Sequence, residues 1–151
     1  MTATANDTLG LLLERAEAER DNAARGLHAA SLQAEAAHAQ HGDLAGYRQH
    51  YQQRWTQSFG QATTMDIVGC YQSFGLRLDQ AVDTQGHVAQ NADQRELRAR
   101  EALRAAEMRV AALRQLIARR EAEAAKTAHR REQRADDEFA ARAHLRRFAH
   151  A

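Results

Sequence analysis

The chain has 151 residues, a net charge of +1 and 27% charged residues. It contains no proline and 34 alanines, whereas valine and isoleucine together number only six. This composition excludes a sheet protein, because strands need β-branched and aromatic residues, and it predicts long helices or a coiled coil. The longest aliphatic run, Leu11–Leu13, is too short to span a membrane, and the single cysteine, Cys70, suits a reducing cytoplasm.

The first predicted helix covers residues 7–58. A 3-4 heptad spacing from Leu9 selects fourteen positions, of which eleven are apolar. A pattern sustained over about six heptads is typical of a left-handed coiled coil, so we interpret these positions as the buried seam of the helix. The seam consists of Leu9, Leu13, Ala16, Arg20, Ala23, Leu27, Ala30, Ala34, Ala37, His41, Leu44, Arg48, Tyr51 and Trp55.

A break is predicted at residues 59–63. Gly60 can adopt the left-handed conformation that ends a helix, and Thr63 with Asp66 three residues later resembles the capping box that begins one. Because a short connection makes two long helices antiparallel neighbours, the sequence predicts an all-α fold. This fold is a single αα-hairpin domain over residues 1–151.

The second predicted helix covers residues 64–147 and has a seam of its own, which is interrupted in the middle by polar side chains. With the turn near residues 60–62, residues whose numbers sum to about 122 should face each other. This rule places Tyr51 near Tyr71, Tyr47 near Phe74 and Leu44 near Leu78. The second seam consists of Tyr71, Gly75, Leu78, Val82, Gln85, Ala89, Ala92, Glu96, Ala99, Leu103, Ala106, Val110, Leu113 and Ile117.

The second helix is the longer of the two. Everything after about Ile117 should extend past the start of the first helix as an overhang of roughly 30 residues, about 45 Å long. Residues 1–94 carry a net charge of −5 and residues 95–151 a net charge of +6. Such asymmetry indicates an interaction surface.

Catalysis, cofactor binding and metal binding are not predicted. The chain has no glycine-rich phosphate loop and no nucleophile or zinc motif. His38 and His41 share a helix face, but no Cys/His cluster supplies the further ligands that a metal needs. Acidic residues interleave with the arginines of the overhang, so we predict no nucleic-acid binding, although a helical hairpin that binds nucleic acid stays an alternative.

Aromatic side chains are concentrated around the predicted turn. Six of the eight lie within 28 residues, and Tyr47 flanks the seam, where its ring should stay partly exposed. Exposed aromatics on a narrow coiled coil are typical of partner sites, whereas aromatics within the seam form the core. The six are Tyr47, Tyr51, Trp55, Phe59, Tyr71 and Phe74.

Over most of its length the chain resembles the FliJ family of flagellar export proteins. The resemblance rests on the run from Leu9 to Glu19, the element Tyr71–Asp79 with its Y-x-x-F-x-x-x-L pattern, and the ending Arg131–Ala140. It implies a non-catalytic, cytoplasmic coiled coil that acts as a stalk between the export ATPase ring and the membrane export gate. It also implies contact with export chaperones, and membrane association only through these partners.

The resemblance implies a site for the cytoplasmic domain of the export gate behind the turn. Where the family pattern continues with a histidine, this chain has Gln85, so the resemblance does not establish the polar edge of the site. The ends of the coiled coil, including the overhang, would enter the ATPase ring. The implied gate residues are Gln40, Leu44, Tyr47, Tyr51, Phe74, Leu78, Ala81 and Gln85. The candidate ATPase residues are Arg119, Arg120, Arg130, Arg131, Arg134, Asp136, Asp137 and Glu138.

Two other functions stay open at this point. One is the equivalent stalk protein of a virulence-type injectisome, and the other is a generic coiled-coil scaffold or chaperone.

Overall fold

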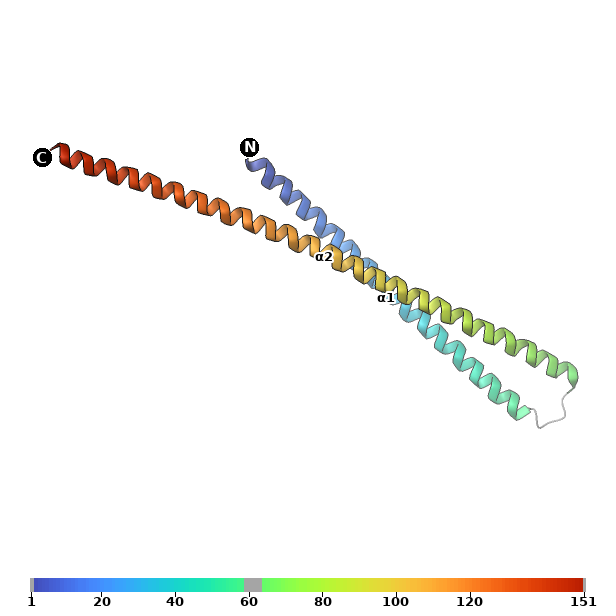
Figure 1. Cartoon of the computed structure of the whole chain (residues 1–151). Coiled ribbons are helices and arrows are strands. Elements are labelled where there is room, and N and C mark those ends of the chain that lie inside the picture. The colour runs from blue at the N-terminus through green and yellow to red at the C-terminus, as the bar shows by residue number, and fades with distance from the viewer. Residues whose placement is uncertain (1, 59–63, 151) are drawn as a thin grey trace. The chain divides into compact units, whose positions relative to one another are not determined.

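The computed structural model describes residues 2–58 and 64–150, with side chains from residue 5 onward. Two helices, α1 (Thr2–Ser58) and α2 (Met65–Ala149), make up the fold, which is the predicted antiparallel hairpin (Figure 1). The predicted turn at 59–63, including Gly60 and Thr63, lies outside the described residues. Helix α1 begins five residues earlier than predicted and ends at the predicted residue, whereas α2 begins one residue later and ends two residues later than predicted. Alanine at the two outer ends favours continued helix.

Helix α2 begins after Thr64. The carbonyl oxygen of Thr64 accepts a hydrogen bond from the backbone N–H of Val68 at 3.2 Å, which is the first bond of the helix. Asp66 lies in the first turn, where its negative charge is favourable at the positive end of the helix dipole.

The two predicted seams are confirmed in full. All fourteen positions on each helix are buried or half-buried. The side chains that are almost completely buried all belong to a seam, and most are small, so the helices can approach closely. They are Leu9, Ala16, Ala34, Ala37, Val82, Ala89, Ala106 and Val110.

The first packed region comprises residues 19–58 and 64–106, in which the end of α1 lies antiparallel to the start of α2. The expected contact of Tyr51 with Tyr71 is present. The predicted register is nevertheless wrong by about one helical turn along the whole region, because a β-carbon added at Gly75 would lie 3.6 Å from the Tyr51 ring and Trp55 packs against Tyr71. The ring of His41 lies against Gly86, where an added β-carbon would be 3.4 Å from the His41 Nε2, whereas the rule predicts Ala81. The rule assumes that the helices face each other symmetrically about residues 60–62, which heptad spacing alone does not establish, because seam positions recur every three or four residues.

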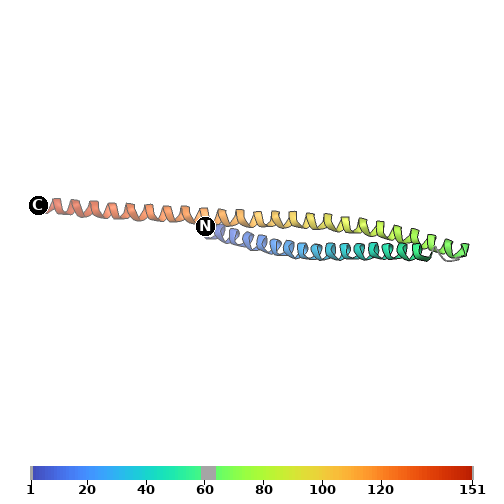
Figure 2. The same ribbon diagram turned by 90° about the horizontal axis from the view of Figure 1, so that it is seen from below.

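The second packed region comprises residues 2–18 and 107–150. Leu9, Ala16 and Val110 are buried in it, and Arg114 forms an ion pair with Glu17 at 3.0 Å. Every residue from 118 to 150 is exposed. Figure 2 shows this orange-to-red part of α2 with no neighbour among the described residues. The predicted overhang after Ile117 is thereby confirmed.

Candidate protein-binding surfaces

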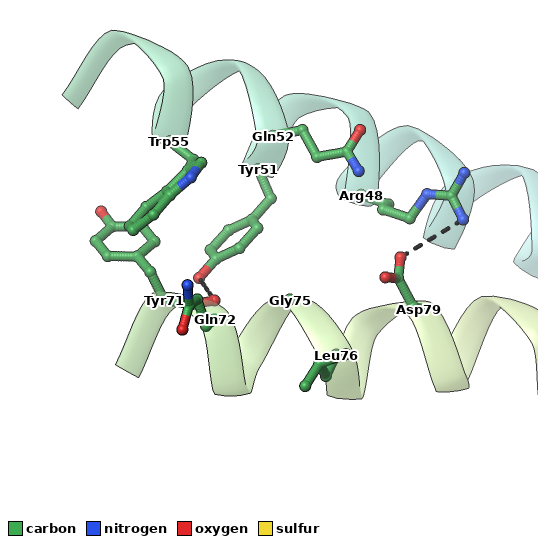
Figure 3. Close-up of a pocket in the computed structure, with 9 residues that line it drawn as sticks. All are labelled: Arg48, Tyr51, Gln52, Trp55, Tyr71, Gln72, Gly75, Leu76 and Asp79. Carbon is green, nitrogen blue, oxygen red and sulfur yellow. Dashed lines mark hydrogen bonds and ion pairs between the residues drawn. The ribbon is translucent and has the colours of Figure 1, made fainter. Parts of the chain in front are cut away.

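Four aromatic rings join the two helices next to the turn. The ring of Tyr51 packs against Tyr71 with ring centres 5.4 Å apart, and Trp55 packs against Tyr71 at 4.7 Å (Figure 3). Tyr51 also packs against Phe74 at 4.9 Å. All three pairs are tilted, an arrangement that contributes beyond simple area burial. The half-buried Tyr51, Trp55 and Tyr71 are therefore core residues of this end of the hairpin.

Tyr51 is also anchored through its hydroxyl group. The hydroxyl donates a hydrogen bond of 2.8 Å to the main-chain carbonyl of Tyr71 (Figure 3). Burial raises the pKa of the Tyr51 phenol above its ordinary value of 10.0, and the nearby Tyr71 and Cys70 raise it further. Both effects favour the neutral phenol, which can donate this bond.

Polar contacts join the helices along one side of the seam in residues 19–106, which we call the bridged side. Arg48 forms an ion pair with Asp79 at 3.6 Å, and His38 contacts Asp93 at 2.9 Å. Near the turn, a hollow of about 370 Å³ lies between the Arg48–Asp79 pair and the Trp55 ring (Figure 3). Asp79 and Asp93 each directly follow a seam position, which places them on the same side of α2.

The opposite side of the seam, which we call the open side, presents apolar surface. Near the turn, a hollow of about 470 Å³, the Tyr47 hollow, is lined by Tyr47, Phe74 and Leu78 together with Tyr51, His50 and Arg54. Tyr47 is 73% exposed and Phe74 52% exposed. Since Tyr51 lines the hollows of both sides, its ring separates them.

A second hollow of about 380 Å³, the Val88 hollow, lies farther along the open side. Between the two hollows, the side-chain amide of Gln85 donates to the carbonyl oxygen of Ala37 and to the side chain of Gln40, both at 3.2 Å. The Val88 hollow is lined by Gln33, Ala36, Ala37, Gln40, Val88, Asn91, Ala92 and Arg95.

The structure brings the predicted gate residues together in part. Tyr47, Tyr51, Phe74 and Leu78 line one hollow, and Gln40 and Gln85 are hydrogen-bonded to each other. Leu44, which lies in the seam, and Ala81, which lies beside it, are half-buried. Sequence reasoning missed Val88 and Arg95. Their position could have been found, because Phe74, Ala81, Val88 and Arg95 follow one another at seven-residue intervals on α2.

The predicted ATPase residues all lie on the overhang, and every one of them is exposed. Large apolar side chains are exposed among them as well, because Phe139 is 78% exposed and Leu145 and Phe148 are each 69% exposed. The ring of His144 meets the ring of Phe148 edge-on at 4.8 Å. An i,i+4 ion pair joins Arg100 to Glu96 at 2.6 Å, in the part of α2 that precedes the overhang.

The residues that could hold a metal are dispersed. Among the described residues, no three His, Cys, Asp or Glu side chains gather closely enough to bind an ion. His38 contacts Asp93, and His41 packs on Gly86. In the parts of the chain that the structure describes, neither helix contains a stretch long and apolar enough to span a membrane.

Comparison with known proteins identifies a protein family. A protein-family model described as "Flagellar FliJ protein" matches residues 6–148, which is nearly the whole chain. No curated protein and no solved structure matches. The match includes the open side, the bridged side and nearly all of the overhang.

Proposed function

This chain belongs to the FliJ family of flagellar proteins and is a component of flagellar protein export, and we propose that it links two parts of the export apparatus. In this proposal it is a stalk-like coiled coil between the export ATPase ring and the cytoplasmic domain of the membrane export gate. It works at the cytoplasmic face of the membrane at the flagellar base, is held there by its partners, and assists export chaperones. The match to a flagellar family does not favour the injectisome alternative.

The gate is assigned to the open side. The observation that carries this assignment is the exposure of Tyr47 and Phe74 around a shared hollow. Exposed aromatic side chains beside an apolar recess are the usual anchors of a protein interface, because they bury a large area while losing little rotamer freedom. Tyr51 and Leu78 form the half-buried floor of this site.

The ATPase ring is assigned to the overhang. A helix that is exposed on every face and carries both charges, as this one does, is suited to a cavity lined by several subunits. The FliJ family is a non-enzymatic one, and in this proposal the ATPase supplies the hydrolysis. The basic cluster of Arg130, Arg131 and Arg134 and the acidic cluster Asp136–Glu138 would make the contacts.

Binding of the gate is tested with two matched variants. Tyr47→Ala removes an exposed side chain from the open side, and Leu76→Ala removes a 65% exposed side chain from the bridged side. In calorimetric titration with the purified gate domain, Tyr47→Ala should weaken binding about tenfold or more, and Leu76→Ala less than about twofold. Helicity measured by circular dichroism should not change. If Tyr47→Ala loses binding and helicity together, the residue belongs to the core and the assignment fails.

Binding of the ATPase is tested by truncation. A chain that ends after Arg119 keeps both seams but lacks nearly all of the overhang. It should remain a folded hairpin that no longer promotes assembly or activity of the ATPase ring, and the full chain serves as the control. ATPase stimulation at the level of the full chain would remove the assignment.

A further inference from the structure

We propose that the gate-binding surface continues along the open side as far as the Val88 hollow. The surface would bind one continuous segment of the partner, with one apolar side chain at each hollow and a carboxylate at each end, opposite Arg54 and Arg95. This inference rests on the proposed function, because it takes the open side as the gate site. It adds Val88 and Arg95 to the residues that determine specificity.

The two hollows lie on one line along the hairpin. On each helix, residues seven apart return to nearly the same face. Both hollows therefore fall on the same side of the seam. Their α1 residues are about 14 positions apart, which corresponds to about 21 Å along the helix axis. The line comprises Gln33, Gln40, Tyr47 and Arg54 on α1 and Phe74, Ala81, Val88 and Arg95 on α2.

Between the two hollows, the surface has a small side chain and a polar group that is already hydrogen-bonded. Ala81 is small and half-buried, and the Gln85 amide is held by Ala37 and Gln40. A partner segment can therefore cross this stretch without leaving the Gln85 donor unpaired. An unpaired buried donor would otherwise reduce affinity.

Apolar area remains available on this side of the hairpin. Val88 is 46% exposed at its hollow, in addition to the exposed Tyr47 and Phe74. The hydrogen bonds of Gln85 join the helices on the open side, whereas on the bridged side the ion pair of Arg48 with Asp79 and the contact of His38 with Asp93 cross the seam. A partner with apolar side chains is better accommodated on the open side, where it does not have to desolvate these charged groups.

Charge indicates what lies at the ends of the partner segment. Arg54 lines the Tyr47 hollow and Arg95 lines the Val88 hollow, so each end of the line carries a positive charge. An arginine at the rim of an apolar recess is complementary to a carboxylate, which it can hold with two parallel hydrogen bonds. The partner segment is thus apolar in its middle and acidic at its ends.

The test compares exposed residues on the two sides of α2. Val88→Asp and Arg95→Glu change the open side, and Leu97→Asp is the matched control, because Leu97 is 56% exposed and directly follows the seam residue Glu96, which places it on the bridged side. In titration with the purified gate domain, Val88→Asp should weaken binding about tenfold and Arg95→Glu about three- to tenfold. Leu97→Asp should change the affinity by less than about twofold. Circular dichroism should show the same helicity for all three variants.

The outcomes separate this inference from the proposed function. If Tyr47→Ala weakens binding and Val88→Asp stays within twofold of the unmodified chain, the extended surface is refuted and the gate site stands. If the unmodified chain does not bind the gate domain at all, both fail. If the chain alone forms dimers in sedimentation that Val88→Asp disrupts, the occupant is a second copy and the inference is overturned.

Discussion

The hydroxyl of Tyr51 on α1 and the main-chain carbonyl of Tyr71 on α2 are joined by a hydrogen bond of 2.8 Å. This bond fixes the register of the helices at the end where the rings of Tyr51, Trp55, Tyr71 and Phe74 pack together. We expect Tyr51→Phe to keep the ring contacts and to lower the free energy of unfolding by about 1 kcal/mol. Urea denaturation measures the change. Tyr47→Phe is the control, and an equal loss there would show that the bond has no special role.

The stability of the hairpin should fall in alkaline solution because of the same residue. The pKa of Tyr51 is raised in the folded chain, so the folded state holds its proton more tightly than the unfolded state. The stabilisation is complete below the ordinary pKa of 10.0 and is lost as pH rises through the higher folded value. Melting temperatures from pH 9 upward should fall more steeply for the unmodified chain than for Tyr51→Phe. Parallel curves would contradict the prediction.

Gly42 lies within α1 with open space around it, because an added β-carbon would meet nothing within 4 Å. We expect Gly42→Ala to raise the free energy of unfolding by about 0.5–1 kcal/mol, since alanine loses less backbone freedom in a helix. Gly86→Ala is the comparison, and its β-carbon would lie 3.4 Å from the His41 ring. Gly86→Ala should therefore raise the free energy of unfolding by less than Gly42→Ala. Denaturant titrations measure both values. If the free energy of unfolding rises more for Gly86→Ala than for Gly42→Ala, the His41 ring can move away at no cost and the prediction is wrong.

The overhang should contribute helix but little stability to the hairpin. Because residues 118–150 are all exposed, a chain ending after Arg119 should unfold at nearly the same denaturant concentration as the full chain, while its total helical signal falls. A chain ending after Ala106 also removes the buried Val110 and should be less stable by about 1 kcal/mol or more. Equal destabilisation by both truncations would contradict this description of the overhang.

Much of the fold could be predicted from local sequence pattern. The seams from Leu9 to Trp55 and from Tyr71 to Ile117 follow from heptad spacing, because the side of a helix that becomes buried depends on residues only three and four apart. The overhang follows from the unequal lengths of the helices. The register could not be predicted, because it depends on contacts such as those of Tyr51 with Gly75 and of His41 with Gly86, which join different helices.

The candidate site could also be predicted only in part, because residues beside a seam are visible in the sequence whereas contacts between the two helices are not. Tyr47 and Phe74 stand out as aromatic residues beside the seam, and the structure places them around one hollow. The difference between the bridged and open sides was not predicted. It arises from pairings such as His38 with Asp93, which depend on the shifted register. Val88 was missed because a single valine gives no signal in composition, although the seven-residue spacing from Phe74 places it on the same side of α2.

The linking role is tested most directly by a capture experiment with three components. The gate cytoplasmic domain is immobilised, and the export ATPase is added with or without the chain. We expect the ATPase to be retained only with the full chain, and Tyr47→Ala or truncation after Arg119 to abolish this retention. The linking role is refuted if the ATPase is retained without the chain. It is also refuted if the ATPase is not retained although the gate domain and the ATPase each bind the chain separately.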